Sequence, residues 1–228
     1  MYKIIYDSID TTFNQIYKDD EYYNLLNSTN ISVQSFTQKK GTGRGKKKWI
    51  SPRGNIYITI NQKCKSDEIL KNSFYLCLLI HKFLLNNFSV KTQYKWPNDL
   101  YFNNKKIVGV VSKSKIISKY AYIQAGVGIN INNNPLDSSI SLSKIISKKL
   151  SIYDVSNKLI IFLNKNLKKP SSNKIITKYL NRYLMSNFKL KHLNITNEKI
   201  NILKVENDLS LLIDINNKKQ NIFFGELI

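Results

Sequence analysis

A glycine-rich, basic segment is the part of this sequence best suited to binding phosphate. GTGRGKKKW, from Gly41 to Trp49, interleaves three glycines with four cations and ends on a tryptophan. Glycine permits close approach of the backbone to a ligand, so amide groups can point inward while the cations neutralise charge. The segment has neither the GxxxxGK[ST] pattern of a P-loop nor a GxGxxG that opens a helix. The sequence therefore predicts phosphate chemistry of another kind.

A second segment, KWPNDLYFNNKKIVGV, begins at Lys95 and adds polar and charged groups. Its Pro-Asn-Asp is a turn sequence, and a strand-like run follows. On a regular strand the side chain of Lys106 faces opposite to that of Ile107, so the lysine and its apolar neighbour lie on different faces.

Strands and helices must hold these two segments together. The periodicity of apolar residues predicts strands at 2–6, 31–38, 54–62, 90–96, 99–102, 105–111 and 121–132, and helices at 11–27, 66–87, 141–150, 154–168 and 173–186. Ser66 is the expected N-cap of the second helix, whose apolar stripe runs through Leu70, Phe74, Cys77 and His81. Asn103-Asn104 is expected to turn a hairpin.

The helical signal fades from about Asn187. Three strand-like runs follow, at 199–206, 209–215 and 220–227, and they suggest a small β barrel. We therefore expect a large domain over 1–186 and a small one over 187–228. The only linker-like stretch is KKPSSNK, near 168–174.

The net charge of +21 raises the alternative of a nucleic-acid-binding protein. Only three of the 36 basic residues are arginines, although the bidentate guanidinium is the usual reader of phosphates and base edges. Lysine is enriched throughout the chain, so a compositional drift explains the charge better than a binding face does. Two of the three arginines, Arg44 and Arg53, lie in or beside the glycine-rich loop.

The remaining composition favours a cytoplasmic protein without a membrane span. No 18-residue apolar run and no signal peptide are visible. Cys64 and Cys77 form no CxxC pair, which indicates a reducing compartment and neither a disulfide nor a zinc site. His81 and His192 have no partner at the spacing of a metal site or a catalytic triad, so core or surface roles are expected.

The motifs together resemble those of biotin–protein ligases. The family pattern runs from a glutamine through GRGRxGRxW, SPxGNLY, KWPNDL and KxxGIL to GxGINxN. The corresponding segments here, in the same order, are Gln38, GTGRGKKKW, SPRGNIY, KWPNDL, KIVGVV and GVGININ. The resemblance is strong over about residues 5–135 and weak over the rest.

This resemblance implies an α+β fold, a central mixed β-sheet flanked by helices like a class II tRNA-synthetase catalytic domain, with a C-terminal SH3-like barrel. It implies an enzyme that uses ATP and Mg²⁺ to convert biotin to biotinyl-5′-AMP. The biotinyl group then passes to a lysine of the biotin carboxyl carrier protein of acetyl-CoA carboxylase. It also implies a short form without specific DNA binding, and a weak homodimer.

The resemblance also assigns roles to residues. Biotin binding falls to Thr11, Thr12, Phe13, Gln38, Thr42, Gly43, Arg44, Lys106 and Gly109. ATP binding falls to Arg44, Trp49, Lys106 and Asn130. Arg44, Lys106 and Lys47 are the catalytic candidates, and Asp99 and Asn130 are the candidates for Mg²⁺. A core role for Trp49 and a turn role for Asp99 remain open alternatives.

The sequence departs from the family pattern at several positions. Phe13 replaces an asparagine, Thr42 stands where a basic residue is common, and Lys113 replaces a glutamate. The alternatives are a basic nucleic-acid-binding protein that keeps the fold without the activity, and a ligase that transfers biotin poorly.

Overall fold

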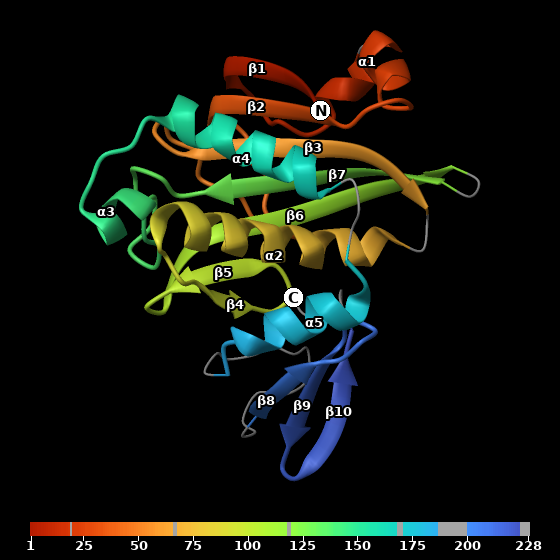
Figure 1. The fold of residues 1–228 in the computed structure, drawn as a ribbon, viewed down its shortest axis with the longest axis vertical. Helices are drawn as coiled ribbons and strands as arrows, with labels where there is room; N and C mark the ends of the chain where they lie inside the picture. The colour runs from red at the N-terminus through yellow and green to blue at the C-terminus, as the bar shows by residue number, and fades with distance from the viewer. Residues whose placement is uncertain (19, 66–67, 118–119, 168–170, 187–199, 224–228) are drawn as a thin grey trace.

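A seven-stranded mixed β-sheet forms the centre of the protein (Figure 1). The computed structural model describes residues 1–18, 20–65, 68–117, 120–167, 171–186 and 200–223. The strand order is β1-β2-β3-β7-β6-β5-β4, and the pair β1–β2 is parallel whereas the other pairs are antiparallel. The strands are β1 (Tyr2–Ile9), β2 (Ile31–Gln38), β3 (Ile56–Lys65), β4 (Gln93–Lys95), β5 (Asp99–Phe102), β6 (Lys105–Ile117) and β7 (Tyr120–Ile129). The predicted α+β class with a mixed sheet is confirmed.

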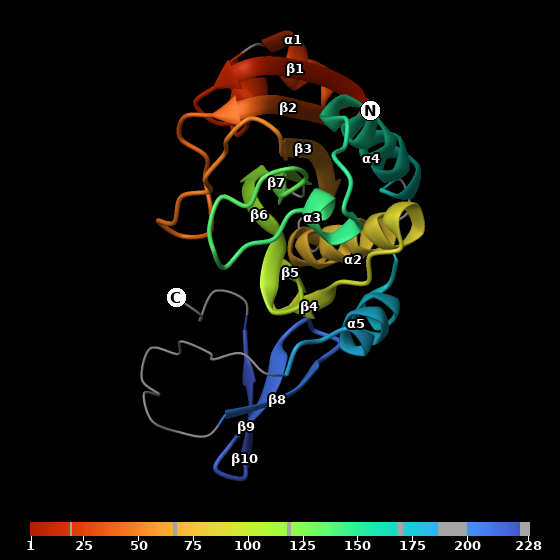
Figure 2. The same cartoon turned by 90° about the vertical axis from the view of Figure 1, so that its left-hand side faces the viewer.

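The two longest helices cover one side of this sheet, and a short helix with the 3-10 turn before it packs on part of the other. The helices are α1 (Asp20–Leu25), α2 (Ile69–Phe88), α3 (Leu142–Ile146), α4 (Ile152–Asn166) and α5 (Asn173–Arg182), with a 3-10 turn η1 (Gln15–Lys18). Figure 2 shows α2 and α4 on one side of the sheet, and the connection from β2 to β3 on the other. The buried side chains of α2, among them Phe74, Leu78 and Phe83, form one apolar cluster with those of β3, β6 and β7. The opposite side of the sheet is therefore the side available for a site.

Pairs of asparagines close two hairpins. Asn103 and Asn104 have φ values of 46° and 60°, and Asn216 and Asn217 have 50° and 65°. A two-residue hairpin turn whose twist matches the strands needs positive φ at both positions, and asparagine tolerates it better than most residues. The turn predicted at 103–104 is confirmed, and the second turn follows the same rule.

The helix predicted over 11–27 is wrong in its first part. Residues 11–14 form a bend, Asn14 has a φ of 65°, and helical structure begins only at Gln15. The amide of Thr12 donates to the side-chain oxygen of Gln38 at 2.9 Å, which fixes this bend against the end of β2. A tertiary hydrogen bond therefore overrides the local helical pattern.

The other predicted strands and helices differ from the observed ones mainly in where they begin and end. The strand predicted at 90–96 is reduced to 93–95, and the helix predicted at 141–150 is reduced to 142–146. Ser66 lies outside the described residues. The N-cap of α2 is instead Glu68, whose side chain makes no cap hydrogen bond.

The C-terminal strands form a second, three-stranded antiparallel sheet in the order β10-β9-β8. These strands are β8 (Ile200–Val205), β9 (Leu211–Ile215) and β10 (Lys218–Ile222). Ile202, Ile213 and Ile222 belong to the same apolar cluster as α2. Three strands alone do not close the expected barrel, and Gly225-Glu226 of the third predicted run lie outside the described residues.

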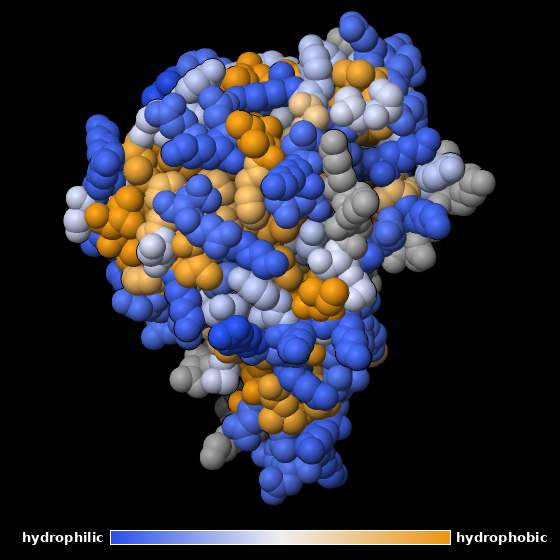
Figure 3. Space-filling model, viewed as in Figure 1, coloured by the Kyte–Doolittle hydropathy of each residue, from blue (hydrophilic) through white to orange (hydrophobic). Residues whose placement is uncertain are grey.

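The surface is consistent with an excess of lysine spread over many elements. Lys158 on α4 and Lys174 and Lys178 on α5 are exposed. In Figure 3 hydrophilic side chains dominate the face that carries these helices, and hydrophobic ones lie in smaller groups between them. Among the helices of the described chain, none is long and apolar enough to cross a membrane.

Buried His81 makes the packing of α2 against α5 sensitive to acid. Its Nδ1 lies 2.7 Å from the Thr92 hydroxyl, and its ring packs on Tyr179 and Tyr183 at centroid distances of 5.5 and 4.2 Å. Burial lowers the pKa of His81 to about 4, and the charges of Lys91 and Lys82 act in the same direction. The folded state therefore prefers the neutral imidazole.

The pKa of His81 is lower in the folded than in the unfolded chain. Its contribution to the free energy of unfolding is therefore complete above about pH 6.5 and is lost as the pH falls toward 4. Between pH 7.5 and 5.0 the wild type should lose about 1–2 kcal/mol more free energy of unfolding than His81→Gln, which cannot titrate. Urea titrations at the two pH values measure this difference. Equal losses in both proteins would show that His81 does not couple stability to pH.

Candidate active site

Five residues on five neighbouring strands pair with one another in a row across the sheet. This row defines the geometry of the open side of the sheet, the side that α2 does not cover. Lys95 on β4 pairs with Asp99 on β5, Asp99 with Gly109 on β6, Gly109 with Gly128 on β7, and Gly128 with Tyr57 on β3. Directly paired residues of antiparallel strands point to the same face. Two charged residues at one end of the row are thus followed by two adjacent glycines, which leave a trough without side chains.

The indole of Trp49 fills this trough. A Cβ added to Gly128 would lie 2.3 Å from Trp49 Cε2, and one added to Gly109 would lie 2.6 Å from Trp49 Cζ3. Any larger residue would collide with the ring, so glycine is required at both positions. The indole Nε1 is buried and has no hydrogen-bond partner among the described residues. Trp49 therefore lies in the site itself rather than in the main apolar core.

Phe13 occupies a neighbouring part of the same face. A Cβ on Gly126, two residues before Gly128 on β7, would lie 2.6 Å from Phe13 Cζ. The ammonium of Lys113 lies 4.7 Å from the centroid of the Phe13 ring, within the range of a cation–π contact. Two departures from the family pattern, Phe13 and Lys113, thus contact each other. The rings of Phe13 and Trp49 therefore both pack over glycines, Phe13 over Gly126 and Trp49 over Gly109 and Gly128.

A β-bulge brings Lys106 onto this face. The pairing of β5 with β6 shifts between Leu100 and Tyr101, so that Asp99 faces Gly109 while Tyr101 faces Lys106. Residues three apart on a regular strand point to opposite faces, and the extra residue of the bulge reverses this. A Cβ on Gly109 would accordingly lie 3.1 Å from Cε of Lys106. Ile107 and Val108 are both fully buried, as expected where two consecutive residues share the bulge.

Lys106 forms an ion pair with Asp99. The Lys106 Nζ lies 2.7 Å from Asp99 Oδ2 and 5.0 Å from the centroid of the Trp49 ring. The two side chains are 28% and 18% exposed, so water screens the pair less than an open surface pair. Asp99 Oδ1 is buried without a hydrogen-bond partner among the described residues. Asp99 therefore lies beside Lys106 on the uncovered face of the sheet.

Asn130 is tied to the strand that carries Lys106. Its amide donates to the carbonyl of Ile107 at 2.9 Å, and its side-chain Nδ2 donates to the carbonyl of Lys106 at 3.2 Å. Its Oδ1 is buried without a partner among the described residues, as is Asp99 Oδ1. Two orphaned oxygens of the kind that bind hard cations therefore adjoin Lys106.

The glycine-rich segment folds into a small hairpin beside the trough. The amide of Gly43 donates to the Lys47 carbonyl at 2.8 Å, and that of Trp49 donates to the Gly41 carbonyl at 2.9 Å. Gly45, with a φ of 61°, allows the turn. These bonds fix Trp49 at the end of the hairpin.

Arg44 and Lys47 lie within electrostatic reach of the charged end of the row. Burial lowers the pKa of Arg44, and the charge of Asp99 opposes that shift. Burial likewise lowers the pKa of Lys95; Asp99 again opposes the shift, and the cations Lys106 and Lys47 add to it. Lys47 itself is exposed. Three cations, Arg44, Lys95 and Lys106, therefore interact with the Asp99 carboxylate, and Lys47 interacts with Lys95.

Neutral polar groups mark the opposite end of the site. Gln38 Oε1 accepts from the amide of Thr12 at 2.9 Å and from its hydroxyl at 3.2 Å, and Gln38 Nε2 donates to the Ser51 hydroxyl at 3.0 Å. Ser51 in turn donates to the carbonyl of Trp49 at 2.8 Å. The hydroxyl of Thr11 accepts from the amide of Phe13 at 3.3 Å. This chain connects the polar end to the loop that carries the tryptophan.

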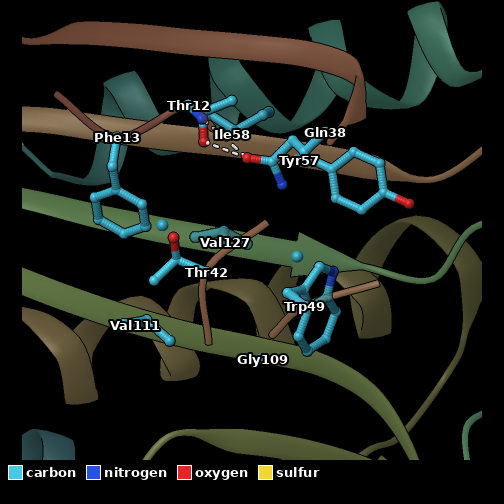
Figure 4. Close-up of a pocket in the computed structure, with 12 residues that line it drawn as sticks. Thr12, Phe13, Gln38, Thr42, Trp49, Tyr57, Ile58, Gly109, Val111 and Val127 are labelled. Carbon is cyan, nitrogen blue, oxygen red and sulfur yellow. Dashed lines mark hydrogen bonds between the residues drawn. The ribbon is translucent and has the colours of Figure 1, made fainter. Parts of the chain in front are cut away.

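The pocket between these ends is nearly filled. Its free volume is about 20 Å³, enough for roughly one water molecule. Figure 4 shows Phe13 and Trp49 at its two ends, Thr42 between them, and Gln38 bonded to Thr12. The residues that line it include Thr12, Phe13, Gln38, Thr42, Trp49 and Gly109, all predicted from the sequence.

Three residues of the site were not predicted from the sequence. Lys95 and Ser51 were quoted only as parts of motifs, because nothing in the sequence places them beside Asp99 and Gln38. The side-chain oxygen of Asn55 accepts from the amides of Ile131, Asn132 and Asn133 at 2.8 to 3.1 Å, and so fixes the chain after β7. The signal available in the sequence was that Asn55 directly follows Gly54.

The comparisons with known proteins identify the family. The model of the biotin/lipoate A/B protein ligase family matches residues 6–130, more than half of the chain, and the protein belongs to this family. A biotin–protein ligase of Schizosaccharomyces pombe is 27% identical over 187 residues, which cover 72% of this chain and 28% of the relative. Biotin–protein ligase 2 of Arabidopsis thaliana is 30% identical over 103 residues, covering 42% of this chain and 31% of the relative. The chain thus spans less than a third of the length of these relatives.

Solved structures share the fold along nearly the whole chain. The biotin protein ligase of Aquifex aeolicus in complex with biotin and ATP has a TM-score of 0.74 and 22% identity, covering 100% of this chain and 97% of the other. The biotin protein ligase of Leishmania major in complex with biotinyl-5-AMP has a TM-score of 0.69 and 17% identity, covering 98% and 99%. At these identities the comparison establishes the fold.

Gly128→Ala should displace the indole of Trp49, since the new methyl group would lie 2.3 Å from Trp49 Cε2. We expect a loss of about 1–3 kcal/mol in stability and a shift of tryptophan emission to longer wavelength. Emission spectra and urea titrations measure both. The matched control is the same substitution in a Trp49→Phe background, where only Trp96 emits and no shift is expected. An unchanged spectrum in the single variant would contradict the packing of Trp49 on Gly128.

Proposed function

We propose that the protein activates biotin with ATP to form biotinyl-5′-AMP and transfers the biotinyl group to a lysine of a biotin carboxyl carrier protein. One observation carries the proposal: the trough has neutral hydrogen-bonding groups at one end and clustered cations at the other. Thr12 and Gln38 mark the first end, and Lys106 and Arg44 the second. Biotin has this polarity, with a neutral ureido ring and a carboxylate separated by an apolar chain. Family membership supports the same assignment.

In the first step an oxygen of the biotin carboxylate attacks the α-phosphorus of ATP, and the bond to the bridging oxygen breaks. Pyrophosphate leaves with the electron pair. Because two anions must meet, the protein's part is to position them and to neutralise charge. Lys106 and Arg44 perform this role, with Lys47 as a further cation. In the second step a lysine amine of the carrier attacks the carbonyl carbon of the adenylate, and AMP leaves.

The residues around Lys106 fit a magnesium ion bound together with nucleotide phosphates. Asp99 Oδ1 and Asn130 Oδ1 are buried oxygens without partners among the described residues. Mg²⁺ is commonly held by one or two carboxylates together with substrate phosphates, rather than by a cage of protein groups. The described residues contain no group of three or more His, Cys, Asp or Glu that could hold a metal. When bound, the ion would neutralise phosphate charge.

Two aromatic side chains must move when the substrate binds, since a free volume of about 20 Å³ cannot hold biotin. Trp49 lies on Gly109 and Gly128, and Phe13 on Gly126. Trp49 ends a loop rich in glycine and lysine, with little apolar surface to fix it elsewhere. We assign Trp49 to a wall of the biotin and nucleotide site and Phe13 to its ring end, with Thr11, Thr42, Gly43 and Gly109 lining the ligand.

The C-terminal part has a supporting role in this proposal. We propose that residues 187–228 form a small SH3-like domain beside a catalytic domain of residues 1–186, which is similar to that of class II tRNA synthetases. The carrier of acetyl-CoA carboxylase is the proposed acceptor, and the cytoplasm is the proposed compartment. We also propose a weak homodimer and no specific binding to DNA.

The direct test is incubation with biotin, MgATP and a biotin carboxyl carrier domain, followed by a streptavidin blot. We expect labelling that depends on all three components, and biotin-dependent ATP–pyrophosphate exchange. Absence of both activities, together with tight and salt-dependent binding to any DNA duplex, would instead favour the nucleic-acid alternative that the net charge of +21 raises.

Lys106→Ala should slow adenylation by about 10²–10³-fold, the usual effect of removing one preorganised charge-stabilising group. The neighbouring Lys105 is exposed on the same strand and provides a matched control, because Lys105→Ala removes the same charge away from the site. Single-turnover formation of biotinyl-AMP measures the rate. Adenylation by Lys106→Ala at the rate of Lys105→Ala would remove Lys106 from the mechanism.

Gln38→Ala should raise the biotin KM by about 10-fold and the ATP KM much less, since unpaired polar atoms of a buried ring cost about 1–3 kcal/mol. Thr37→Ala, on the other face of the same strand, is the control. Initial rates at varied biotin and varied ATP separate the two constants. If Gln38→Ala raised both KM values equally, the residue would have a structural role only.

A further inference from the structure

The hydrogen bonds at the polar end of the trough form one connected chain. It begins at Thr59, passes through Thr12, Gln38 and Ser51, and ends on the carbonyl of Trp49. Figure 4 shows the bond between Thr12 and Gln38, which both line the pocket. Thr59 is fully buried and is not among the residues that line the pocket. The direction of each bond decides which atoms are left for a ligand.

Backbone groups fix the orientation of the Gln38 side chain. The amide of Thr12 can only donate, so the Gln38 atom that lies 2.9 Å from it is Oε1. The carbonyl of Trp49 can only accept, so the Ser51 hydroxyl gives its proton to that carbonyl at 2.8 Å. Ser51 must then accept from Gln38 Nε2, which lies 3.0 Å away. Both ends of the Gln38 amide therefore require the same orientation.

The number of available protons sets the direction of the bond between the two threonines. The Thr12 hydroxyl lies 3.2 Å from Gln38 Oε1, which can only accept, so the single proton of Thr12 is used there. The Thr59 hydroxyl lies 2.7 Å from that of Thr12 and is therefore the donor. A reversed bond would leave two acceptor oxygens facing each other in a buried place, which costs free energy. The chain of hydrogen bonds thus starts at Thr59.

Thr59 is held more firmly than the residues that it orients. It lies within β3 and pairs with Val33 on β2 and with Gly126 on β7. Because paired residues share a face, its side chain lies on the same open face as Gly126. Thr12 lies in the bend between β1 and η1, and Gln38 is the last residue of β2. A strand paired on both sides thus sets the position of two less constrained residues through one hydroxyl group.

This direction determines what the polar end offers to a ligand. One N–H of Gln38 Nε2 is bonded to Ser51, and the second has no acceptor among the described residues. The Thr12 oxygen donates its proton to Gln38 and accepts from Thr59, so one of its two lone pairs is left. A neutral ring with adjacent carbonyl and N–H groups, such as a cyclic urea, matches this set of one donor and one acceptor.

We infer that Thr59 is a positioning residue of the ring end. Its hydroxyl orients Thr12, and through Thr12 the side chain of Gln38, toward the cyclic urea of biotin. This inference rests on the proposed function and adds to it a residue that does not touch the substrate. Because Thr59 fixes the direction of the hydrogen bonds, the site selects a ring by the order of its donors and acceptors as well as by its shape.

Thr59→Val tests this role, because valine keeps the shape of threonine and removes the hydroxyl. In calorimetric titrations with biotin alone, the variant should bind about 3–10-fold more weakly, the effect of losing one hydrogen bond. Thr59→Ser retains the hydroxyl and should restore most of the affinity. Thr177→Val is the matched control, since it removes a buried threonine hydroxyl on α5 that donates to the Asn173 carbonyl at 3.0 Å. The control should leave biotin binding within about twofold, because α5 lies on the other side of the sheet.

A double-mutant cycle with Thr12 separates positioning from a general loss of structure. Thr12→Val removes the Thr12 hydroxyl but keeps the amide that bonds to Gln38. If Thr59 acts through that hydroxyl, Thr59→Val should change biotin binding by less than about twofold in the Thr12→Val background. Additive effects of the two substitutions, or equal affinities of the wild type and Thr59→Val, would overturn the inference.

A cyclic guanidinium tests the direction of the hydrogen bonds. 2-Iminobiotin carries such a ring, protonated at neutral pH, and presents N–H groups where biotin presents its carbonyl. It should bind the wild type at least about 10-fold more weakly than biotin, since the open N–H of Gln38 would face another donor. Gln38→Glu presents an acceptor instead and should narrow this difference. Equal binding of both ligands by the wild type would contradict the orientation assigned to Gln38.

ATP–pyrophosphate exchange keeps this inference and the proposed function apart. Thr59→Val should raise the biotin KM and leave the ATP KM within about twofold, because the charged end is unchanged. If the wild type bound biotin but performed no biotin-dependent exchange, the proposed function would fail, whereas the titrations would still decide the role of Thr59. No measurable binding of biotin by the wild type would overturn the inference as well.

Discussion

The β-bulge between β5 and β6 is the feature on which the charged end of this site depends. In a regular strand Lys106 would point away from the face of Gly109, toward the side that α2 covers with apolar residues. The shift of pairing between Leu100 and Tyr101 turns Lys106 to the open face, beside Asp99 and the indole of Trp49. The bulge thereby keeps the ammonium of Lys106 out of the apolar core and places it in the trough. Bulges that redirect a side chain are common next to active sites.

The adjacent glycines explain the shape of the site. Gly109 and Gly128 pair directly, and Gly126 lies two residues away, so the middle of the sheet has a strip of bare backbone on one face. The protein fills this strip with Trp49 and Phe13 rather than leaving a cavity, because empty apolar space forfeits dispersion contacts. In the proposed function, a ligand occupies the same strip when the rings withdraw. Packing of the free protein and binding of the proposed substrate would then compete for the same surface.

The described C-terminal strands support the site through packing. Buried residues of β8, β9 and β10 share the apolar cluster of α2, and Asn181 on α5 bonds to both the amide and the carbonyl of Val205. Residues 183–185 pair with β4, the short edge strand that carries Lys95. An edge strand of three residues has few ladder hydrogen bonds of its own. Its support from α5 and the second sheet stabilises the charged end of the row.

The sequence by itself predicted most of the elements, and its motifs supplied the candidate residues of the site. Strong alternation gave β2 at 31–38 without error, Asn103-Asn104 gave a hairpin, and the motifs gave Gln38, Arg44, Asp99 and Lys106 as site residues. These signals are local, since periodicity and turn chemistry act over a few residues. Tertiary structure decided what depends on distant partners. Thr12 bonds to Gln38 and prevents a helix, the bulge sets the face of Lys106, and the pairing of short β4 with β5 places Lys95 beside Asp99. Strand register and ring packing are fixed only when the whole sheet assembles, because each requires a surface contributed by residues far away in the chain.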